Sequence, residues 1–475
     1  MKQLLDKYKA MSPVAKAPIW YAICSMIQYG ISFITLPIFT EIMTTEQYGL
    51  FTVYQSWMSI MVVFTTLNLQ YGVLNNAMVK YEDKRDEFIS SMIGLVVTLN
   101  LIFFVVFWLL RSRLSELLGM PVCVIVAMFV EMAMTPAFGF WSGKKRFEYR
   151  YREVIAFTLV LAILSPVVGV LTVMNTEDKG VTKIIANVVV LAVLYGFLFS
   201  ILIARGKKLY VKEYWKYALS FGVSLIPYYL SQMIFNQSDR IMIDKMVGKD
   251  KAAIYGVVYG CAMVVNFAIS SINNAFVPWT YERLKDKNYK KLNQVAMALC
   301  AFIGGILIMV MLVSPEIIRI MAADEYYEGI WTMPSITCSL FFLFVSQLFI
   351  NVVFYYEKKN YLVWGSVLAA VANIVLNYIL IKIFGYVAAG YTTLIAYIIF
   401  ALCNYVFMNK MNDTPEQIYD TKIIIWLSLL MIIVTVVITF LYSYIIIRYV
   451  VLLAILIACV LMRKKIFGVI KTIKE

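Results

Sequence analysis

The chain has 475 residues, of which 62% are hydrophobic and 15% are charged, and its mean hydropathy is +0.81. Soluble domains are usually about 45–50% apolar and about 25% charged, so this composition excludes an ordinary soluble enzyme and a disordered chain. The formal net charge of +14 is explained by cytoplasmic Lys and Arg clusters, which set membrane topology, better than by nucleic-acid binding.

Long apolar runs bounded by charged or turn-forming residues predict an all-α polytopic membrane protein of about fourteen transmembrane helices. The first run follows a Lys-bearing amino terminus, is too long for a signal-peptide core and lacks an A-x-A cleavage site, so we expect it to be retained. The least marked boundary separates the last two runs, near Arg448. The runs are approximately 18–43, 48–74, 88–110, 117–141, 153–174, 182–204, 217–246, 252–279, 293–314, 332–356, 361–383, 386–409, 423–444 and 447–462.

The distribution of basic residues predicts the orientation. If the amino terminus lies inside, the alternate loops assigned to the cytoplasm carry 31 of the 42 Lys and Arg residues. Acidic residues do not follow this bias, as the positive-inside rule allows. We therefore expect a multi-pass protein of the bacterial cytoplasmic membrane with both termini in the cytoplasm.

Cysteine and histidine usage argues against a metal or catalytic centre. Histidine is absent, which removes the commonest metal ligand and general base. The cysteines show no C-x-x-C pairing, so we expect small core residues, no catalytic residue, no metal site and no bound cofactor. The seven cysteines, all within apolar runs, are Cys24, Cys123, Cys261, Cys300, Cys338, Cys403 and Cys459.

The chain shows a weak internal repeat. QYGLFTVY at 47–54 is echoed 207 residues later by IYGVVYGC at 254–261, and each segment follows a long run that contains proline, Pro37 or Pro227. A six-plus-six repeat would place the second copy near the basic linker 205–216. We therefore expect an amino-terminal lobe at 1–204, a carboxy-terminal lobe at 205–409, and two further helices with a basic tail at 410–475. Repeated halves often place a substrate site between them near the midplane.

Three segments resemble the polysaccharide flippases of bacteria. ITLPIFTEIMTTEQYGLFTVY at 34–54 resembles their first span and loop, and NQSDRIMIDKMVG at 236–248 with AAIYGVVYG at 252–260 resembles their seventh and eighth spans. These proteins form the oligosaccharide flippase branch of the multidrug/oligosaccharidyl-lipid/polysaccharide (MOP) exporter superfamily. The resemblance implies two six-helix lobes around a central cavity with two extra carboxy-terminal helices.

The resemblance also implies an activity, which is the outward movement of undecaprenyl-pyrophosphate-linked oligosaccharide by alternating access for O-antigen-like surface polysaccharide. The expected partners are this glycan substrate, membrane lipids, and the polymerase and glycosyltransferases of the same pathway, with no nucleic acid. The energy source stays open between a proton gradient, a sodium gradient and the membrane potential. An inside-negative membrane potential favours the outward movement of negative charge by a free energy of about 2.3 kcal/mol per charge per 100 mV.

Three predicted spans carry polar side chains at helical spacing. Such stripes are expected where a cavity shelters a glycan and its phosphates, although interhelical hydrogen bonding explains any single residue equally well. The stripes are Tyr21, Ser25, Gln28, Ser32 and Thr35 in the first span, Tyr228, Gln232, Asn236 and Asp239 in the seventh, and Tyr259, Asn266, Ser270 and Asn273 in the eighth.

Four charged residues are the further candidates. Asp239 and Arg240 follow the uncharged stretch 218–238, so Arg240 either attracts pyrophosphate or glycan or pairs locally with Asp239 or Asp244. Glu131 lies midway along the fourth span, where it either binds a coupling proton or cation or accepts a structural hydrogen bond. Glu41 ends the first span, and the resemblance makes it a candidate for the rim of the cavity.

Two basic clusters are explained by topology or by anionic lipid, and substrate recruitment by phosphate binding is the alternative. One contains Lys144, Lys145, Arg146, Arg150 and Arg152, and the other contains Arg205, Lys207, Lys208, Lys212 and Lys216.

Alternative functions remain at this point. A cation-coupled multidrug antiporter of the same superfamily is disfavoured by the two extra spans and the 236–248 motif, whereas a lipid II flippase, also with fourteen spans, is harder to exclude. A membrane-embedded polysaccharide polymerase or transferase is a different class, disfavoured by short outer loops and the absence of histidine. No P-loop motif is present.

Overall fold

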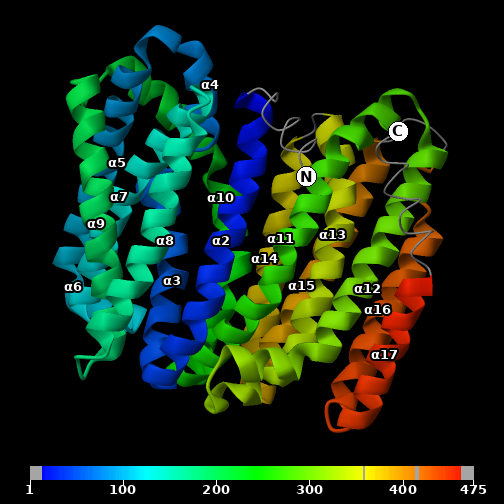
Figure 1. Cartoon of the computed structure of the whole chain (residues 1–475). Coiled ribbons are helices and arrows are strands. Elements are labelled where there is room, and N and C mark those ends of the chain that lie inside the picture. Colours follow the sequence, from blue (N-terminus) through cyan, green and yellow to red (C-terminus); the bar gives the residue numbers. More distant parts are fainter. Residues whose placement is uncertain (1–12, 357–358, 412–416, 462–475) are drawn as a thin grey trace, which may run out of the picture. The chain divides into compact units, whose positions relative to one another are not determined.

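The computed structural model describes residues 13–356, 359–411 and 417–461, and every regular element in these ranges is a helix (Figure 1). The sequence predicted an all-α fold, and this is confirmed. The elements are α2 (Pro13–Ile42), α3 (Thr45–Thr66), α4 (Gly72–Lys80), η1 (Glu82–Lys84), α5 (Arg85–Leu109), α6 (Arg111–Leu118), α7 (Val122–Phe147), α8 (Tyr151–Val173), α9 (Lys179–Gly206), α10 (Lys212–Met246), α11 (Lys249–Lys285), α12 (Tyr289–Met321), η2 (Asp324–Thr332), α13 (Met333–Tyr355), α14 (Lys359–Phe384), α15 (Ala388–Met411), α16 (Thr421–Leu441) and α17 (Ile445–Leu461).

Each of the fourteen predicted apolar runs overlaps one main helix, although the run 48–74 extends past α3 into the start of α4. In the described ranges, twelve helices are long and apolar enough to cross a membrane, and α17 contains a shorter apolar stretch. The remaining helix, α3, has 22 residues, but its Thr, Gln and Ser side chains lower its hydropathy. The chain is therefore a multi-pass membrane protein.

The second predicted span, 48–74, ends earlier than its hydropathy suggested. A capping box between Thr44 and Gln47 starts α3, and left-handed backbone at Leu67 and Asn68, each with φ of 48°, ends it. Leu69 is fully buried, so the chain stays apolar through the turn. Hydropathy does not detect such a turn, because its signal is the backbone conformation.

The last two helices are separated by a turn at 442–444, which confirms that the final apolar stretch forms two helices. Arg448 lies inside the first turn of α17 and not at the break itself. The basic tail 463–475 lies outside the described residues, as does the amino-terminal segment 1–12.

The helices form two compact units, 1–233 and 234–475, and the division falls within α10. The first part of α10 packs on unit 1, because Trp215 donates through Nε1 to the carbonyl of Ser91 at 3.0 Å. The basic linker before it also contacts α5. A Cβ at Gly206 would lie 2.2 Å from the carbonyl oxygen of Asp86, so only glycine permits this approach. The linker of the predicted second lobe therefore packs on unit 1.

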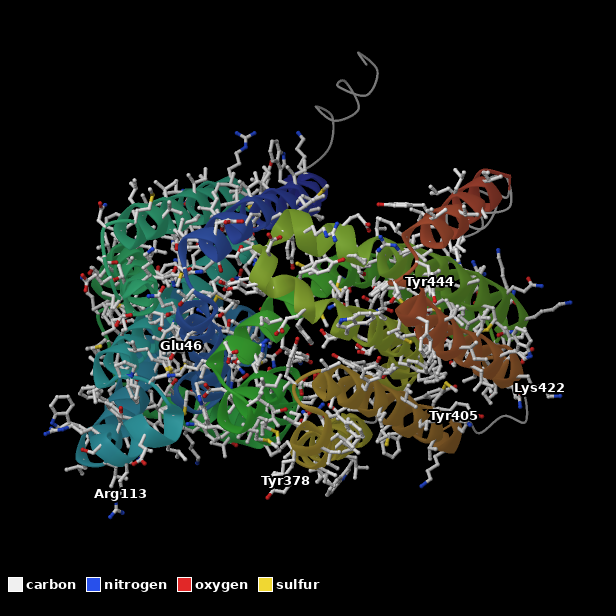
Figure 2. All side chains as sticks on the ribbon, turned by 90° about the horizontal axis from the view of Figure 1, so that it is seen from below. Glu46, Arg113, Tyr378, Tyr405, Lys422 and Tyr444 are labelled. Carbon is white, nitrogen blue, oxygen red and sulfur yellow. The ribbon has the colours of Figure 1, made fainter. Side chains whose placement is uncertain are left out.

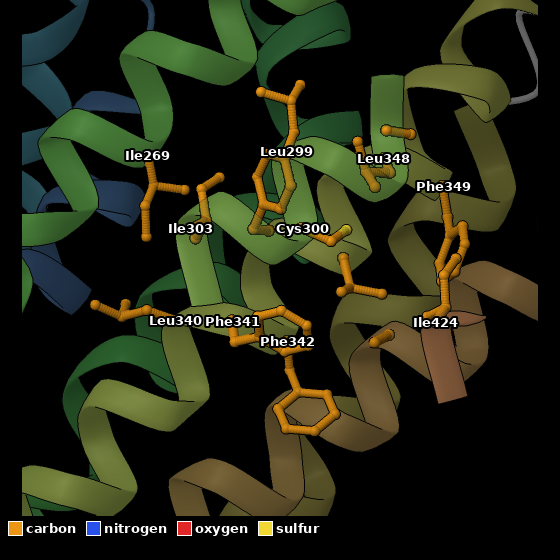
Figure 3. Packing of buried hydrophobic residues seen from close by; sticks show 14 of the residues in the cluster. Ile269, Leu299, Cys300, Ile303, Leu340, Phe341, Phe342, Leu348, Phe349 and Ile424 are labelled. Atoms are coloured by element: carbon orange, nitrogen blue, oxygen red, sulfur yellow. The ribbon is translucent and has the colours of Figure 1, made fainter. Parts of the chain in front are cut away.

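Unit 2 is built around α13, whose side chains are nearly all buried, with α11, α12, α15 and α16 packed against it. Figure 3 shows Cys300 and Ile303 of α12 facing Phe341 of α13, and Ile424 of α16 beside Phe349 of α13. Helix association within a membrane depends on this close side-chain packing, because lipid is as apolar as the helices.

The described cysteines are free thiols. Cys24, Cys261, Cys300 and Cys338 are buried, as expected of core residues, and Cys403 is half-buried. Cys123 is exposed at the start of α7, so its assignment to the core is wrong. The side chain of Cys459 lies outside the described residues.

Candidate functional site

A polar cluster lies inside unit 2, centred on Asp239 in the last part of α10. The Asp239 side chain is 1% exposed. Tyr255 of α11 donates its hydroxyl to Oδ2 at 2.7 Å, and the Thr393 hydroxyl of α15 donates to the same oxygen at 2.6 Å. The other oxygen, Oδ1, accepts a hydrogen bond from Nδ2 of Asn377 in α14 at 2.5 Å. Three helices thus direct donors at one buried carboxylate.

A second layer of amides and hydroxyls surrounds this carboxylate. Asn373 Oδ1 accepts from the Ser238 hydroxyl at 2.8 Å and from Asn377 Nδ2 at 3.1 Å. The Thr392 hydroxyl donates to Asn377 Oδ1. Asn373 and Asn377 are four residues apart, so the regular geometry of α14 places both on its Asp239 side.

No Lys or Arg side chain in the described structure forms an ion pair with Asp239. A buried carboxylate without a counter-ion is costly unless it is hydrogen-bonded, and three neutral donors offset only part of that cost. The cluster supplies one carboxylate with amide and hydroxyl oxygens, which are the ligand types that hard cations prefer. It also suits a transferable proton. In the described part of the chain, no group of three or more His, Cys, Asp or Glu side chains is arranged to hold a metal ion.

Arg240 is held apart from this carboxylate, although it is the next residue. Its guanidinium lies 4.3 Å from the ring centroid of Tyr259, and Nη1 donates to the Asn236 carbonyl at 3.1 Å and to Gln237 Oε1 at 2.7 Å. No ion pair with Asp239 or Asp244 is present among the described residues, so the local-pairing alternative is wrong. The result is a half-buried guanidinium that is oriented by a ring and two oxygen atoms and is not neutralised.

For the other candidates of unit 2, the two hypotheses are a place in a polar cavity and a hydrogen bond between helices. Asn236 accepts a 3.4 Å bond from the hydroxyl of Tyr397, and Gln232 is half-buried on the same helix. Asn273 accepts from Asn351 of α13 at 2.9 Å, which is the helix-bridging role. Asn266 has a buried Oδ1 with no hydrogen-bond partner in the described structure.

In unit 1, Glu131 of α7 accepts a 2.6 Å hydrogen bond through Oε2 from the hydroxyl of Tyr54 in α3. This is the contact that the structural alternative predicted, and a role in ion coupling stays a prediction. The candidates of α2 are not gathered around Glu131: Gln28 is half-buried, and Ser32 and Glu41 are exposed.

Unit 1 also contains a buried lysine that sequence analysis missed. Lys183 of α9 is 7% exposed, and its Nζ lies 3.8 Å from the ring centroid of Phe39, 4.2 Å from that of Tyr48 and 4.0 Å from that of Phe51. Asn373, Asn377 and Thr393 were missed as well. The i, i+4 spacing of the two asparagines within the apolar run 361–383 was the available signal.

The basic cluster that begins at Lys144 is largely neutralised. Lys144 pairs with Asp86 at 2.6 Å, and Lys145 pairs with Glu153 at 2.9 Å, while both lysines approach Glu148. Both lysines are buried and paired with carboxylates, so they bind α5, α7 and α8 together. In the linker cluster, Lys208 pairs with Glu87 at 3.1 Å.

Comparison with known proteins places these features in a family. Residues 14–284, more than half of the chain, match the family model described as "Polysaccharide biosynthesis protein". The chain belongs to this polysaccharide biosynthesis protein family. The match confirms the resemblance to membrane proteins of polysaccharide biosynthesis.

The relatives of this family member span most of its length. Protein 1 of the Lsg locus of Haemophilus influenzae is 26% identical over 381 residues, covering 75% of this chain and 89% of the relative. Among solved structures, the lipid II flippase MurJ in an inward closed conformation has a TM-score of 0.70 at 13% identity, covering 94% of this chain and 100% of its own. An inward-facing multidrug resistance MATE family transporter of the MOP superfamily has a TM-score of 0.65 at 13% identity, covering 83% of this chain and 97% of its own. At these identities the structures show a shared fold.

Proposed function

We propose that this protein translocates undecaprenyl-pyrophosphate-linked oligosaccharide across the cytoplasmic membrane by alternating access. Membership of the polysaccharide biosynthesis protein family carries the proposal. The fold shared with a lipid flippase supports it, because a lipid-linked substrate needs a protein that shelters its polar part within the bilayer. The proposal assigns no catalysis to this chain.

Arg240 is the proposed contact for the pyrophosphate or an acidic sugar. A guanidinium matches phosphate oxygens with paired, charge-assisted hydrogen bonds. Tyr259 stacks against it and Gln237 holds one nitrogen, so the guanidinium is oriented before a substrate arrives. Because no carboxylate neutralises it within the described structure, its charge remains available to an anion.

The cluster around Asp239 is the proposed site of energy coupling. A proton or a sodium ion bound there would supply the positive charge that the carboxylate lacks, while Asn373, Asn377 and Thr393 would offer oxygen ligands to sodium. Asp239 and Arg240 are consecutive residues of α10, so any movement of this helix that follows ion binding also moves the guanidinium. Occupation of one site is thereby linked to the position of the other.

The proposed orientation places both termini in the cytoplasm, and the proposed partners are the polymerase and glycosyltransferases that would use or supply the substrate. A lipid II flippase is the second candidate, favoured by the MurJ match over 94% of the chain. Neither the multidrug antiporter nor a polymerase or transferase has a comparable observation in its favour, although the first shares the fold.

The test is outward movement of a fluorescent polyprenyl-pyrophosphate oligosaccharide in proteoliposomes. We expect wild-type protein to translocate it and Arg240→Ala to lose at least about tenfold in rate, because a charge-assisted contact with the phosphate is removed. Arg111→Ala is the matched control, since Arg111 is exposed and lies 5.0 Å from the ring of Trp108. Equal transport by both variants would remove Arg240 from the path. Failure of wild type with several glycans would contradict the function.

A further inference from the structure

A second polar cluster lies in unit 2, on helices that take no part in the Asp239 cluster. Arg448, in the first turn of α17, donates through Nη2 to Oε1 of Glu316 in α12. The Tyr449 hydroxyl donates to the same oxygen at 2.9 Å. The Arg448 side chain is only 3% exposed, so this ion pair is withdrawn from solvent.

The pair is incompletely hydrogen-bonded. Nε and Nη1 of Arg448, and Oε2 of Glu316, are buried and have no hydrogen-bond partner in the described structure. A buried ion pair offsets its desolvation only when its remaining donors and acceptors are bonded as well. The pair thus has unbonded N–H donors on its guanidinium and an unbonded acceptor oxygen on its carboxylate.

The surroundings of this pair are those of a membrane interface. It lies beside the end of α12 at Met321 and the turn between α16 and α17, which contains Tyr444 (Figure 2). The rings of Trp331 and Tyr442 lie 6.0 Å apart, and aromatic side chains of this kind gather at the level of lipid headgroups. The amino terminus of α17 adds a partial positive charge that favours phosphate.

We propose that Arg448 and Glu316 bind a phospholipid headgroup that carries both a phosphate and a primary ammonium, as phosphoethanolamine does. The phosphate accepts a hydrogen bond from Nη1 of Arg448, and the ammonium donates to Oε2 of Glu316. Tyr449 is 44% exposed and lies against the pair, so rotation of its side chain opens the way from the lipid.

The proposed headgroup chemistry distinguishes three common lipids. Phosphatidylglycerol offers the phosphate but leaves the Glu316 oxygen without a cation. Phosphatidylcholine has a quaternary ammonium with no N–H group to donate. Only phosphatidylethanolamine among the three offers both an acceptor for the guanidinium and an N–H donor for the Glu316 oxygen. This inference does not depend on the transported substrate.

Native mass spectrometry of the full-length protein in detergent, titrated with the three lipids bearing identical acyl chains, tests the proposal. We expect wild type to bind phosphatidylethanolamine about tenfold more tightly than the other two, the effect of one charge-assisted hydrogen bond in a desolvated site. Equal affinities for the three lipids would overturn the proposal.

Substitutions separate this site from a merely structural ion pair. Glu316→Gln removes the ammonium's partner and the repulsion of anions, so the preference should reverse towards phosphatidylglycerol; an unchanged preference would overturn the proposal. Arg448→Gln should abolish selectivity, and Glu316→Gln still decides if that variant fails to fold. Arg319→Gln is the control, since Arg319 is exposed and stacks 4.6 Å from the ring of Tyr327. This variant should keep the wild-type lipid preference. If it lost the preference, general surface charge and not the Arg448–Glu316 pair would select the lipid.

Headgroup and free-phosphate binding are distinguished by competition. Glycerophosphoethanolamine, which has no acyl chains, should displace the lipid at lower concentration than inorganic phosphate does. Displacement by inorganic phosphate at equal or lower concentration would contradict recognition of the ammonium.

Discussion

Asp239 in unit 2 and Lys183 in unit 1 are both buried titratable side chains without an ion-pair partner among the described residues, and their surroundings are opposite in kind. Hydroxyl and amide groups of three helices surround Asp239, whereas three aromatic rings surround the Lys183 Nζ. The oxygen atoms around Asp239 have lone pairs that can turn towards a cation. The contacts that surround the Lys183 Nζ are made mainly by ring faces, which offer a quadrupole in place of lone pairs.

The comparison shows that a buried charge in a membrane helix is not by itself a transport site. Lys183 holds α9 against the α2–α3 hairpin, which is also fastened by Lys179 Nζ donating to the Ile42 carbonyl at 2.7 Å. We therefore expect its role to be structural. Asp239 has a shell that can reorganise, so it is the charge that suits reversible ion binding.

The largest effect is expected from Asp239→Asn, which keeps the size of the side chain and removes the only formal charge of the cluster. Cation binding by the purified protein, measured by calorimetry, should weaken at least about tenfold, because ligand charge dominates affinity for hard cations. Asp244→Asn is the matched control, a half-buried acid of the same helix, and should bind as wild type does. Unchanged binding by Asp239→Asn would remove this cluster as the ion site.

An intermediate effect is expected from Tyr54→Phe in unit 1. The substitution leaves the buried Oε2 of Glu131 without its donor and should lower the free energy of unfolding by about 1–3 kcal/mol. The same change in a Glu131→Gln background should cost less, which a double-mutant cycle measures directly. Additive losses would show that the two side chains do not act on one another.

The smallest effect is expected from Lys183→Met. An apolar chain of similar length fills the space between the rings, and replacing buried ionic groups by apolar groups of similar volume is often neutral or stabilising. Both the melting temperature and transport should stay close to wild type. Loss of transport at unchanged stability would show that Lys183 takes part in function and would break the contrast with Asp239.

Apolar runs in the sequence were enough to predict the helical fold, because a membrane span needs about 20 apolar residues and little else. They did not predict the turn at Leu67 and Asn68, where the signal is backbone conformation. The polar stripes of the first, seventh and eighth spans identified Asp239 and Arg240 as candidates. They did not reveal that Asn377 and Thr393, about 140 and 150 residues further along the chain, complete the Asp239 shell. Such pairings depend on how α14 and α15 pack against α10, which periodicity in one helix does not specify.

Substrate selection by the wild-type protein tests the central claim most directly. Proteoliposomes should be offered a polyprenyl-pyrophosphate oligosaccharide, lipid II and a cationic drug in parallel, with and without a sodium or proton gradient. The account predicts that the lipid-linked oligosaccharide moves fastest and that the gradient accelerates it. Faster movement of lipid II or of the drug, or transport of none of the three, would contradict the proposed function.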